Sequence, residues 1–395
     1  MRQRQYIVTR QDVHGRAMSL LTTHLRLPDF SRRCPAPSVP AVVLLAAARL
    51  GSVFAAAGRL LAVPSAETIR QALAAALPER EELERRLSRA LVADLPRPLV
   101  GTRQPLACDL TLRPYHGRPF AHADEVYRSR AKSGTSHFHA YATVYLVCRG
   151  RRLTLALTWV RRREPLTEVL RRLLAQVRRA GLRPRYLLLD RGFCAVDVIR
   201  YLQAGRYPFL MPLPVRGRRI DHPDGPSGSR VFAYARRSAW GQYTLTNARG
   251  RRATVRVGVK CRNRRGERGR HGRDRLVYAL WGLTPPTLEW VRQTYRRRFG
   301  IETSYRQMNQ AKVTTCTRNP LVRLFLVGVA LILRNVWVRL HWQVLSSPRR
   351  GGRALRPERL RFKDLLLWIQ HVIEHEFTAW DATAAERPLA QPLAA

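Results

Sequence analysis

The sequence predicts an α/β protein in which helices flank a mixed sheet, a β-rich insertion interrupts the sheet domain, and a helical N-terminal domain precedes it. Three observations support this fold class. Residues 1–100 carry helical patterns, whereas apolar runs of strand length begin at residue 101. Three such runs are followed by alternating helical and strand-like segments, as in layered α/β folds. The chain has 395 residues, 45% of them hydrophobic, which is enough for a sizeable core.

The helical N-terminal domain, residues 1–100, is expected to contain several helices. Residues 41–63 are rich in Ala, Leu and Val and predict a buried helix or helix pair broken near Gly51. Ser65 is suited to cap a helix over 66–76, and 81–95 is expected to be a charged helix. Both a small DNA-binding module and a packing domain fit this block, because no helix-turn-helix pattern is strong enough to decide.

The first part of the sheet domain covers residues 101–212. Three short apolar runs predict strands, and the CRGRR segment between the second and third indicates a hairpin. A helix ended by Gly181, a buried strand ending in Asp190, another helix and another strand follow. The expected strands are 105–112, 139–147, 153–160, 185–190 and 207–211, and the expected helices are 165–180 and 195–205.

This order of elements is that of the ribonuclease H-like fold. In that fold the first and fourth strands are neighbours, so Asp109 and Asp190 are expected to meet although 81 residues separate them. Glu302 is expected on a helix packed beside them. Two of these acids also have plainer roles open to them. Asp190 can cap the helix that follows it, and Glu302 can pair with Arg298 and Arg306, four residues away on either side.

The rest of the chain divides into three parts. Residues 213–284 hold Gly-, Pro- and Arg-rich loops between probable strands, which predicts a β-rich insertion with basic loops. Residues 285–345 complete the sheet domain, with a long helix that starts at Pro285 and Pro286 and contains Glu302, and a second, apolar helix. Residues 346–395 are a linker and an amphipathic helix suited to docking or dimerisation. The strands expected in the insertion are 241–246, 252–260 and 276–281, and the later helices are 320–342 and 362–377.

The chain is strongly basic. It carries 72 Lys and Arg against 27 Asp and Glu, a net charge of +45 spread over its length. The natural partner of such a surface is a polyanion, most often nucleic acid. The 6 cysteines include no CxxC pair, so they signal neither a zinc ribbon nor a disulfide framework. The N-terminus has no signal-peptide pattern and the apolar run 324–333 is too short to span a bilayer, which favours a soluble intracellular protein.

Three carboxylates that converge in a basic protein indicate a metal site. Hard oxygen ligands suit Mg²⁺ or Mn²⁺, and two such ions about 4 Å apart can activate water and stabilise the leaving oxygen of a phosphodiester. Asp109, Asp190 and Glu302 are therefore the candidate catalytic and metal-binding residues. The arginines around them are expected to neutralise phosphate and position the DNA strand.

The segment YRRRFGIETSYRQ resembles the tyrosine–arginine–glutamate signature of insertion-sequence DDE transposases, with the spacing Tyr-x2-Arg-x3-Glu at Tyr295, Arg298 and Glu302. The sequence DRGF at 190–193 is similar to that family's second motif, Asp-x-Gly-Tyr/Phe. The sequence DLT at 109–111 resembles the first, without its second Asp. The stretches HFHAYAT, LTLALTWV and the pair TRNP–LILRN are similar to the halobacterial-type subgroup of these elements.

The resemblance extends over about residues 101–343 and implies a transposase that cleaves DNA and transfers the strand in a Mg²⁺-dependent cut-and-paste reaction. The implied partners are double-stranded DNA, namely terminal inverted repeats and target DNA, and a second copy of the chain in a DNA-bound homodimer. No membrane is implied, and the protein is expected in the prokaryotic cytoplasm, on the nucleoid when it acts. The implied DNA contacts are Tyr295, Arg298, Arg306, Lys312 and Arg191.

The chain departs from the family pattern at Asn309, where a lysine is usual, and Arg306 and Lys312 are the candidate substitutes. In relatives an insertion tryptophan holds a flipped base at a hairpinned DNA end, and Trp240 and Trp281 are candidates for that role here. Two other functions stay open. One is a DNA-binding protein built on a catalytically decayed copy, and the other is a stand-alone nuclease that never rejoins DNA ends.

Overall fold

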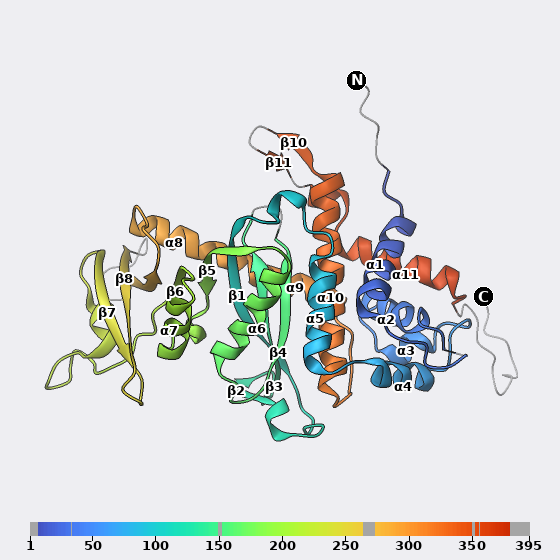
Figure 1. Cartoon of the computed structure of the whole chain (residues 1–395), viewed down its shortest axis with the longest axis horizontal. Coiled ribbons are helices and arrows are strands. Elements are labelled where there is room, and N and C mark those ends of the chain that lie inside the picture. The colour runs from blue at the N-terminus through green and yellow to red at the C-terminus, as the bar shows by residue number, and fades with distance from the viewer. Residues whose placement is uncertain are drawn as a thin grey trace, which may run out of the picture.

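The computed structural model describes residues 7–32, 34–148, 152–263, 273–349, 352–354 and 356–379. A twisted sheet runs through the centre and out to one end of the molecule, and a block of helices forms the other end (Figure 1). Helix α1 (Arg10–Leu25) and helix α11 (Phe362–Glu376) pack together in that block, so the first and last described helices are neighbours.

The central strands have the order expected of a ribonuclease H-like sheet, which confirms the predicted fold class. Strand β1 pairs antiparallel with β3 and parallel with β5, β4 lies outside β3, and β6 is parallel to β5. The spatial order is therefore β4, β3, β1, β5, β6. The bounds are β1 Arg103–Pro114, β3 Thr135–Leu146, β4 Thr154–Val160, β5 Arg183–Leu189 and β6 Phe209–Pro212.

One strand was not predicted. Strand β2 (Tyr127–Lys132) forms a hairpin with β3 through Ser133 and Gly134, whose φ angles are 53° and 76°. Positive φ at two successive residues is the geometry of a tight hairpin turn. The strand escaped the sequence analysis because its side chains are almost all exposed, so it lacks the apolar alternation that marks a half-buried strand.

The three strands expected in the insertion are present and widen the same sheet. They are β7 (Ala239–Thr246), β8 (Arg252–Asn263) and β9 (Arg273–Trp281). Strand β9 pairs antiparallel with β6, and β8 and β7 follow it, so nine of the described strands form one continuous sheet. The described strands of the insertion therefore continue the sheet.

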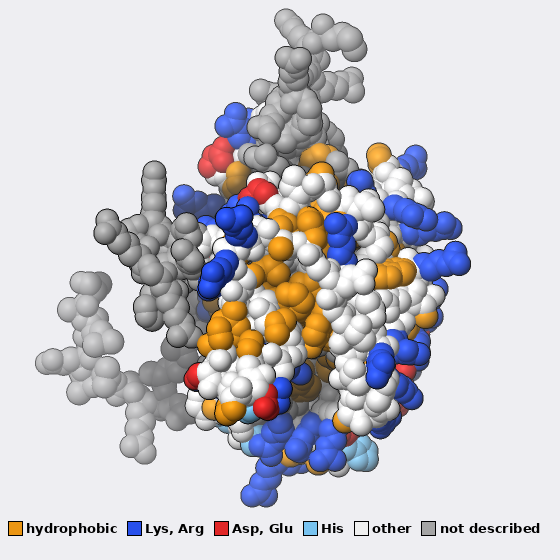
Figure 2. Space-filling view, turned by 90° about the vertical axis from the view of Figure 1, so that its left-hand side faces the viewer, with side chains coloured by type: hydrophobic (Ala, Val, Ile, Leu, Met, Phe, Trp, Pro, Cys, Tyr) orange, Lys and Arg blue, Asp and Glu red, His pale blue; other side chains and the backbone are white. Residues whose placement is uncertain are grey.

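The end of the molecule that carries this insertion has an apolar stripe. Figure 2 looks onto that end, where hydrophobic side chains gather down the middle and Lys and Arg lie around them. Of the two tryptophans predicted to meet a flipped base, Trp240 is 36% exposed and the Arg256 guanidinium lies 4.0 Å from its ring centroid. Trp281 stacks on Phe209 within the sheet, with ring centroids 6.5 Å apart. A role for either in holding a base remains a prediction.

The two faces of the sheet are covered by different helices. Leu187 and Leu189 of β5 point into a core covered by α6 (Leu166–Arg179) and α7 (Val196–Ala204). Leu188, between them, points into the opposite core, which is covered by α8 (Leu288–Arg296) and α9 (Gly300–Met308). This period-two alternation is the reason for the unbroken apolar run of β5.

The long helix expected to contain Glu302 is broken, so that prediction is corrected. Helix α8 begins after Thr287, whose side chain accepts a hydrogen bond from the Trp290 backbone N–H. A 3₁₀ turn, η5 (Arg297–Phe299), then separates α8 from α9. The tighter turn shifts the helical face, and it places Arg298 in the interior of the molecule instead of on a solvated stripe.

The N-terminal helices do not have a core of their own. They share one hydrophobic core with α10 (Pro320–Leu340), α11 and Trp159 of β4, which favours the packing role over a separate DNA-binding module. Helix α11 packs against α1 and α2 through its apolar face, so that face is not available for docking or dimerisation as was expected. The remaining helices of the block are α2 Ser38–Ala48, α3 Val53–Ala57, α4 Ala66–Ala76 and α5 Arg80–Val92.

Two C-terminal segments differ from their sequence predictions. Within the segment expected to be a linker, strands β10 (Ser347–Arg349) and β11 (Gly352–Ala354) pair as a small antiparallel ladder. Residues Pro320–Leu345 form a helical stretch that is long and apolar enough to cross a membrane by length and composition. Because 78% of its most apolar window is buried inside the protein, its apolar character is accounted for by its position in the core.

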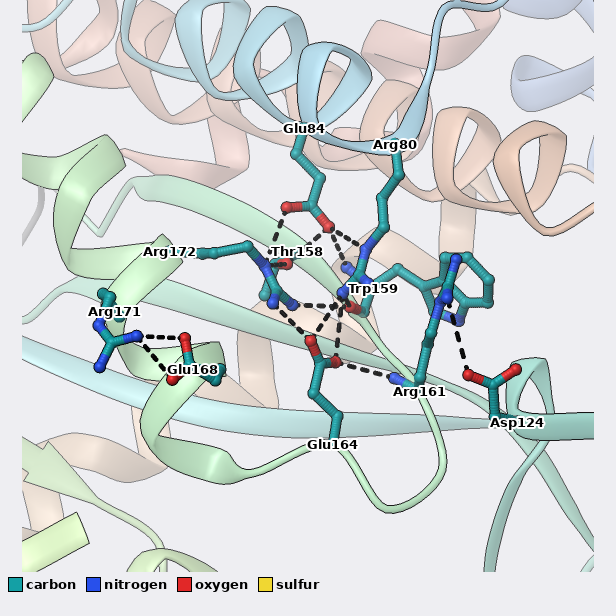
Figure 3. Close-up of polar contacts among 10 residues, drawn as sticks. All are labelled: Arg80, Glu84, Asp124, Thr158, Trp159, Arg161, Glu164, Glu168, Arg171 and Arg172. Atoms are coloured by element: carbon teal, nitrogen blue, oxygen red, sulfur yellow. Dashed lines mark hydrogen bonds and ion pairs between the residues drawn. The ribbon is translucent and has the colours of Figure 1, made fainter. Parts of the chain in front are cut away.

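A buried polar cluster joins the N-terminal helices to the sheet (Figure 3). Glu84 of α5 is only 2% exposed and accepts hydrogen bonds from the Thr158 hydroxyl at 2.6 Å and the Trp159 backbone N–H at 2.9 Å. The guanidinium groups of Arg80 and Arg172 lie 3.2 Å and 3.3 Å from its carboxylate oxygens. The same two arginines also pair with Glu164, so two acids and two bases neutralise one another in the interior.

Replacing Glu84 with Ala is expected to lower the free energy of unfolding by about 3–5 kcal/mol, because it leaves two buried guanidinium groups short of a partner. Urea denaturation measures the loss. Glu168→Ala is the matched control, since Glu168 pairs with Arg171 in the same region but is 43% exposed, and it should cost less than about 1 kcal/mol. Equal losses of unfolding free energy in the two variants would show that the buried cluster stabilises the protein no more than an exposed ion pair does.

Candidate active site

Two of the predicted acids lie side by side at the ends of parallel strands. The register of β1 against β5 pairs Cys108 with Leu189, so the next residues, Asp109 and Asp190, come together where β5 ends. Asp109 stays within β1 and is buried, with only 11% of its side chain exposed. Asp190 follows β5 and is 46% exposed. The carboxyl ends of parallel strands are common places for functional side chains.

A single guanidinium connects all three predicted acids. Arg298 Nη1 lies 3.0 Å from Asp109 Oδ2, and its Nη2 lies 3.2 Å from Glu302 Oε1 and 3.8 Å from Asp190 Oδ1. The Arg298 side chain is only 7% exposed. Side chains from β1, from the end of β5 and from α9 therefore converge on one buried positive charge.

The Tyr295 hydroxyl completes the surroundings of this arginine. It accepts a hydrogen bond from Arg298 Nε at 3.0 Å, and both residues are 6% exposed. The Tyr295 and Phe299 ring centroids each lie 5.5 Å from the guanidinium carbon. An arginine held by aromatic rings and three carboxylates has little freedom to rotate.

Tyr295 and Arg298 lie inside the protein, and a contact of either side chain with DNA remains a prediction. Both side chains are directed into the protein, where Arg298 uses its donors on the acids and on Tyr295. Their position fits a role in orienting the carboxylates. The other predicted DNA contacts, Arg191, Arg306 and Lys312, are exposed on the surface.

The three carboxyl groups do not share the same electrostatic environment. Burial raises the pKa of Asp109 to about 6, while the Arg298 guanidinium acts in the opposite direction and the Asp190 charge adds to the rise. Asp190 and Glu302 are each 46% exposed. The group of acids is therefore closed on the Asp109 side and open to solvent on the side of the other two.

A contact that was not predicted from the sequence fixes α9 on the sheet. Tyr305 lies on α9, one turn after Glu302. Its hydroxyl forms a 2.6 Å hydrogen bond with the Thr143 hydroxyl of β3 and lies 3.5 Å from the Asp109 carbonyl oxygen. The helical spacing of Tyr305 from Glu302 was the available signal, but spacing does not reveal a hydroxyl partner on another strand.

Asn309, at the position of the expected lysine, has a structural partner. Its side-chain oxygen accepts a hydrogen bond from Arg113 Nη1 at 2.6 Å. Arg113 lies on β1, four residues after Asp109. The end of the motif is thus attached to the strand that carries the first acid.

The donor set fits a divalent metal ion in chemistry, but the present arrangement holds an arginine among the carboxylates. Three carboxylates of the required hard type converge. Among the described residues, however, no three acidic, His or Cys side chains are grouped so that they could hold a metal ion as they stand. Binding between these acids therefore requires Arg298 to release at least part of its contacts.

A family model described as the transposase DDE domain matches residues 103–334, which is more than half of the chain. The chain belongs to this family. The match begins at β1 and ends within α10, so it includes all three acids and the insertion between them. The earlier resemblance to DDE transposases is confirmed, whereas the halobacterial-type subgroup remains a prediction.

The DDE transposase agrees in fold with a solved structure. The cryo-EM structure of a piggyBac transposase synaptic complex with hairpin DNA superposes with a TM-score of 0.52 at 10% sequence identity, over 100% of this chain and 88% of that one. No curated protein matches the sequence. As a member of its family the protein is a transposase, a DNA nuclease and strand transferase, and enzymes of this family generally use divalent metal ions.

Proposed function

We propose that this transposase moves an insertion sequence by cut-and-paste, through Mg²⁺-dependent cleavage at the element ends followed by strand transfer. The observation that carries the proposal is the convergence of Asp109, Asp190 and Glu302 on the buried Arg298. Three carboxylates from separate elements repel one another, so a fold that gathers them uses them together.

The proposed roles follow from the positions of the side chains. Asp109, Asp190 and Glu302 would hold Mg²⁺ or Mn²⁺, and two bound ions would supply charge stabilisation for the attacking and leaving oxygens. Arg298 and Tyr295 are positioning residues that keep the carboxylates aimed at one point. The exposed side chains of Arg191, Arg306 and Lys312 would neutralise DNA phosphates, as the excess of positive charge also suggests.

The proposed partners are the terminal inverted repeats of the element, target DNA and a second copy of the chain. Two DNA ends must be held together for a coordinated excision, which calls for at least a homodimer on DNA. The protein would act in the cytoplasm of a prokaryote. A decayed, binding-only copy is disfavoured, because all three acids are retained and Asn309, the residue that departs from the family pattern, is integrated through Arg113.

Incubation of the purified protein with DNA that carries the inverted repeats flanking its reading frame tests the proposal. In Mg²⁺ or Mn²⁺ we expect free element ends and products joined to target DNA, and neither in EDTA. Cleaved ends without joined products would indicate a stand-alone nuclease. Binding without any cleavage would indicate a decayed copy.

A further inference from the structure

A cavity of about 570 Å³ lies beyond the far end of α9 from Glu302. Its walls come from the end of β1, the segment from Lys312 to Cys316, and the first half of α10. The α10 wall is apolar and includes Leu326 and Ala330. The cavity is therefore distinct from the group of three acids but shares β1 with Asp109, and its wall from Lys312 to Cys316 follows the helix of Glu302 in the chain.

Three cationic side chains line this cavity, and its lining contains no acidic residue. They are Arg113, Lys312 and Arg323. None of them forms an ion pair with any described residue, whereas Arg80, Arg172 and Arg298 all face carboxylates. Three like charges gathered without a counter-charge repel one another, and a bound anion would relieve that repulsion.

Arg113 has an unused donor. Its Nη1 donates to Asn309, but its buried Nε has no hydrogen-bond partner among the described residues. Burial lowers the pKa of the Arg113 guanidinium and of the Lys312 ammonium, which reflects the cost of holding these charges without a partner. A bound anion would remove part of that cost.

Arg323 is held in place by the loop that borders the cavity. Its Nε donates to the Thr317 carbonyl oxygen at 2.7 Å, its Nη2 lies 3.3 Å from the Thr315 carbonyl oxygen, and its guanidinium stacks 4.7 Å from the Tyr115 ring centroid. These contacts fix its direction without neutralising its charge. The site is thus built in advance, which reduces the entropy lost when an anion binds.

The cavity and the acids lie along the same face of β1. Residues 109 and 113 are separated by two pleats of β1, so their side chains leave the same face of the strand, about 13 Å apart at roughly 3.3 Å per residue. This separation corresponds to about four base-pair steps of DNA along its axis. A strand with its cleavage site at the acids can therefore reach the cavity with a nearby phosphate.

We propose that the cavity lined by Arg113, Lys312 and Arg323 binds a backbone phosphate of the DNA strand whose cleavage site lies at Asp109, Asp190 and Glu302. The inference rests on the proposed function, since it takes the three acids as the place of cleavage. The apolar wall of α10 packs against the sugar that carries the phosphate. Phosphate is the shared chemistry of two sources, bound DNA and free inorganic phosphate, and the experiment separates them.

The test measures binding of a terminal-repeat duplex in EDTA as a function of salt. Each neutralised phosphate contributes about 0.9 to the slope of log K against log salt, so the double variant Arg113→Gln/Lys312→Gln, which loses the one phosphate, should lower the slope by about 1, and Lys312→Gln should lower it by up to that amount. Arg179→Gln is the matched control, because Arg179 is exposed on α6, across the sheet from α9, and should leave the slope unchanged. Equal slope changes in the control and the cavity variants would overturn the proposal.

A second measurement locates the phosphate. Replacing single phosphates near the cleavage site with neutral methylphosphonates should weaken binding of the wild-type protein about tenfold at one position and leave the double variant insensitive there. If the losses of affinity caused by the methylphosphonate and by the double variant simply add at every position, the proposal is overturned. Binding of inorganic phosphate at millimolar concentration, together with unchanged salt slopes for DNA binding in the variants, would also overturn it, because the cavity would then hold free phosphate and not DNA. Lys312→Gln keeps the test valid if the double variant fails to fold, since Lys312 is exposed.

The two proposals fail in different ways. Unchanged slopes in a protein that still cleaves and joins DNA would remove the phosphate site and leave the proposed function standing. Lowered slopes in a protein that never cleaves would support the phosphate site and count against the cut-and-paste reaction.

Discussion

Asp109→Asn, Asp190→Asn and Glu302→Gln are each expected to lower DNA cleavage by about a thousandfold or more, equivalent to about 4 kcal/mol of transition-state stabilisation. The three side chains surround one point, and an amide in place of a carboxylate removes a charged ligand from a site that needs hard anionic oxygens. The measurement is nicking of a terminal-repeat duplex in Mg²⁺, with binding of the same duplex followed separately.

DNA binding should survive in all three variants, because each substitution removes a negative charge from a basic protein. Asp197→Asn is the matched control. Asp197 is 51% exposed and pairs with Arg251 away from the three acids, so its loss should leave both cleavage and binding unchanged. Full cleavage by all three site variants would refute the assignment of these carboxylates.

Misfolding would not explain a loss of DNA cleavage in Asp109→Asn, because this substitution should stabilise the metal-free protein. The folded pKa of Asp109 is raised from 3.8 to about 6, so the folded state holds a proton that the unfolded state releases within that window. Stability from this group is present below pH 4 and is lost as pH rises through 6, at a cost of about 3 kcal/mol above it. In EDTA, Asp109→Asn should therefore melt higher than the wild type at pH 7.5 and converge with it near pH 4.

The sequence predicted most of the elements because their patterns depend on local physics. Apolar runs mark strands buried on both faces, and the register of β1 against β5 brings Asp109 to Asp190 once the order of strands is known. What escaped prediction lacks such a pattern. Strand β2 is exposed, so its sequence shows no alternation of apolar and polar residues. The apolar face of α11 has the same sequence pattern whether it packs against α1 or against another molecule.

The charged groups of the site were harder to interpret than its fold. The four-residue spacing of Arg298 and Glu302 was visible, but the 3₁₀ turn that directs Arg298 inward was not. A stripe of charged residues on a helix normally faces solvent, so Arg298 was expected to meet phosphate. Arg113 gave no signal at all, since a single arginine on a strand resembles every other arginine until Asn309 and α10 are placed around it.

Arg298→Gln is expected to lower the free energy of unfolding of the metal-free protein by about 3–5 kcal/mol at pH 7.5, because it removes the guanidinium that all three carboxylates share. Without it, Asp109 would be buried and ionised beside two other negative charges. The loss should shrink near pH 5, where Asp109 takes up a proton. Arg298→Lys should recover part of the stability, since an ammonium restores the charge but not the forked geometry.

The Arg298→Gln variant also distinguishes two roles of Arg298. Its guanidinium either only supports the fold or occupies the position that a metal ion takes between the acids. If Arg298 occupies the position between the acids that a divalent ion would take, Mg²⁺ or Mn²⁺ should raise the melting temperature of Arg298→Gln more than that of the wild type. Arg306→Gln is the control, because Arg306 lies on α9 four residues beyond Glu302, is exposed and pairs with no acid among the described residues, so it should respond to metal as the wild type does. Equal metal-induced shifts in all three proteins would mean that Arg298 only supports the fold. A larger shift in Arg298→Gln alone would mean that this buried guanidinium competes with metal for the carboxylates and that exchange between the two is part of how the site is prepared.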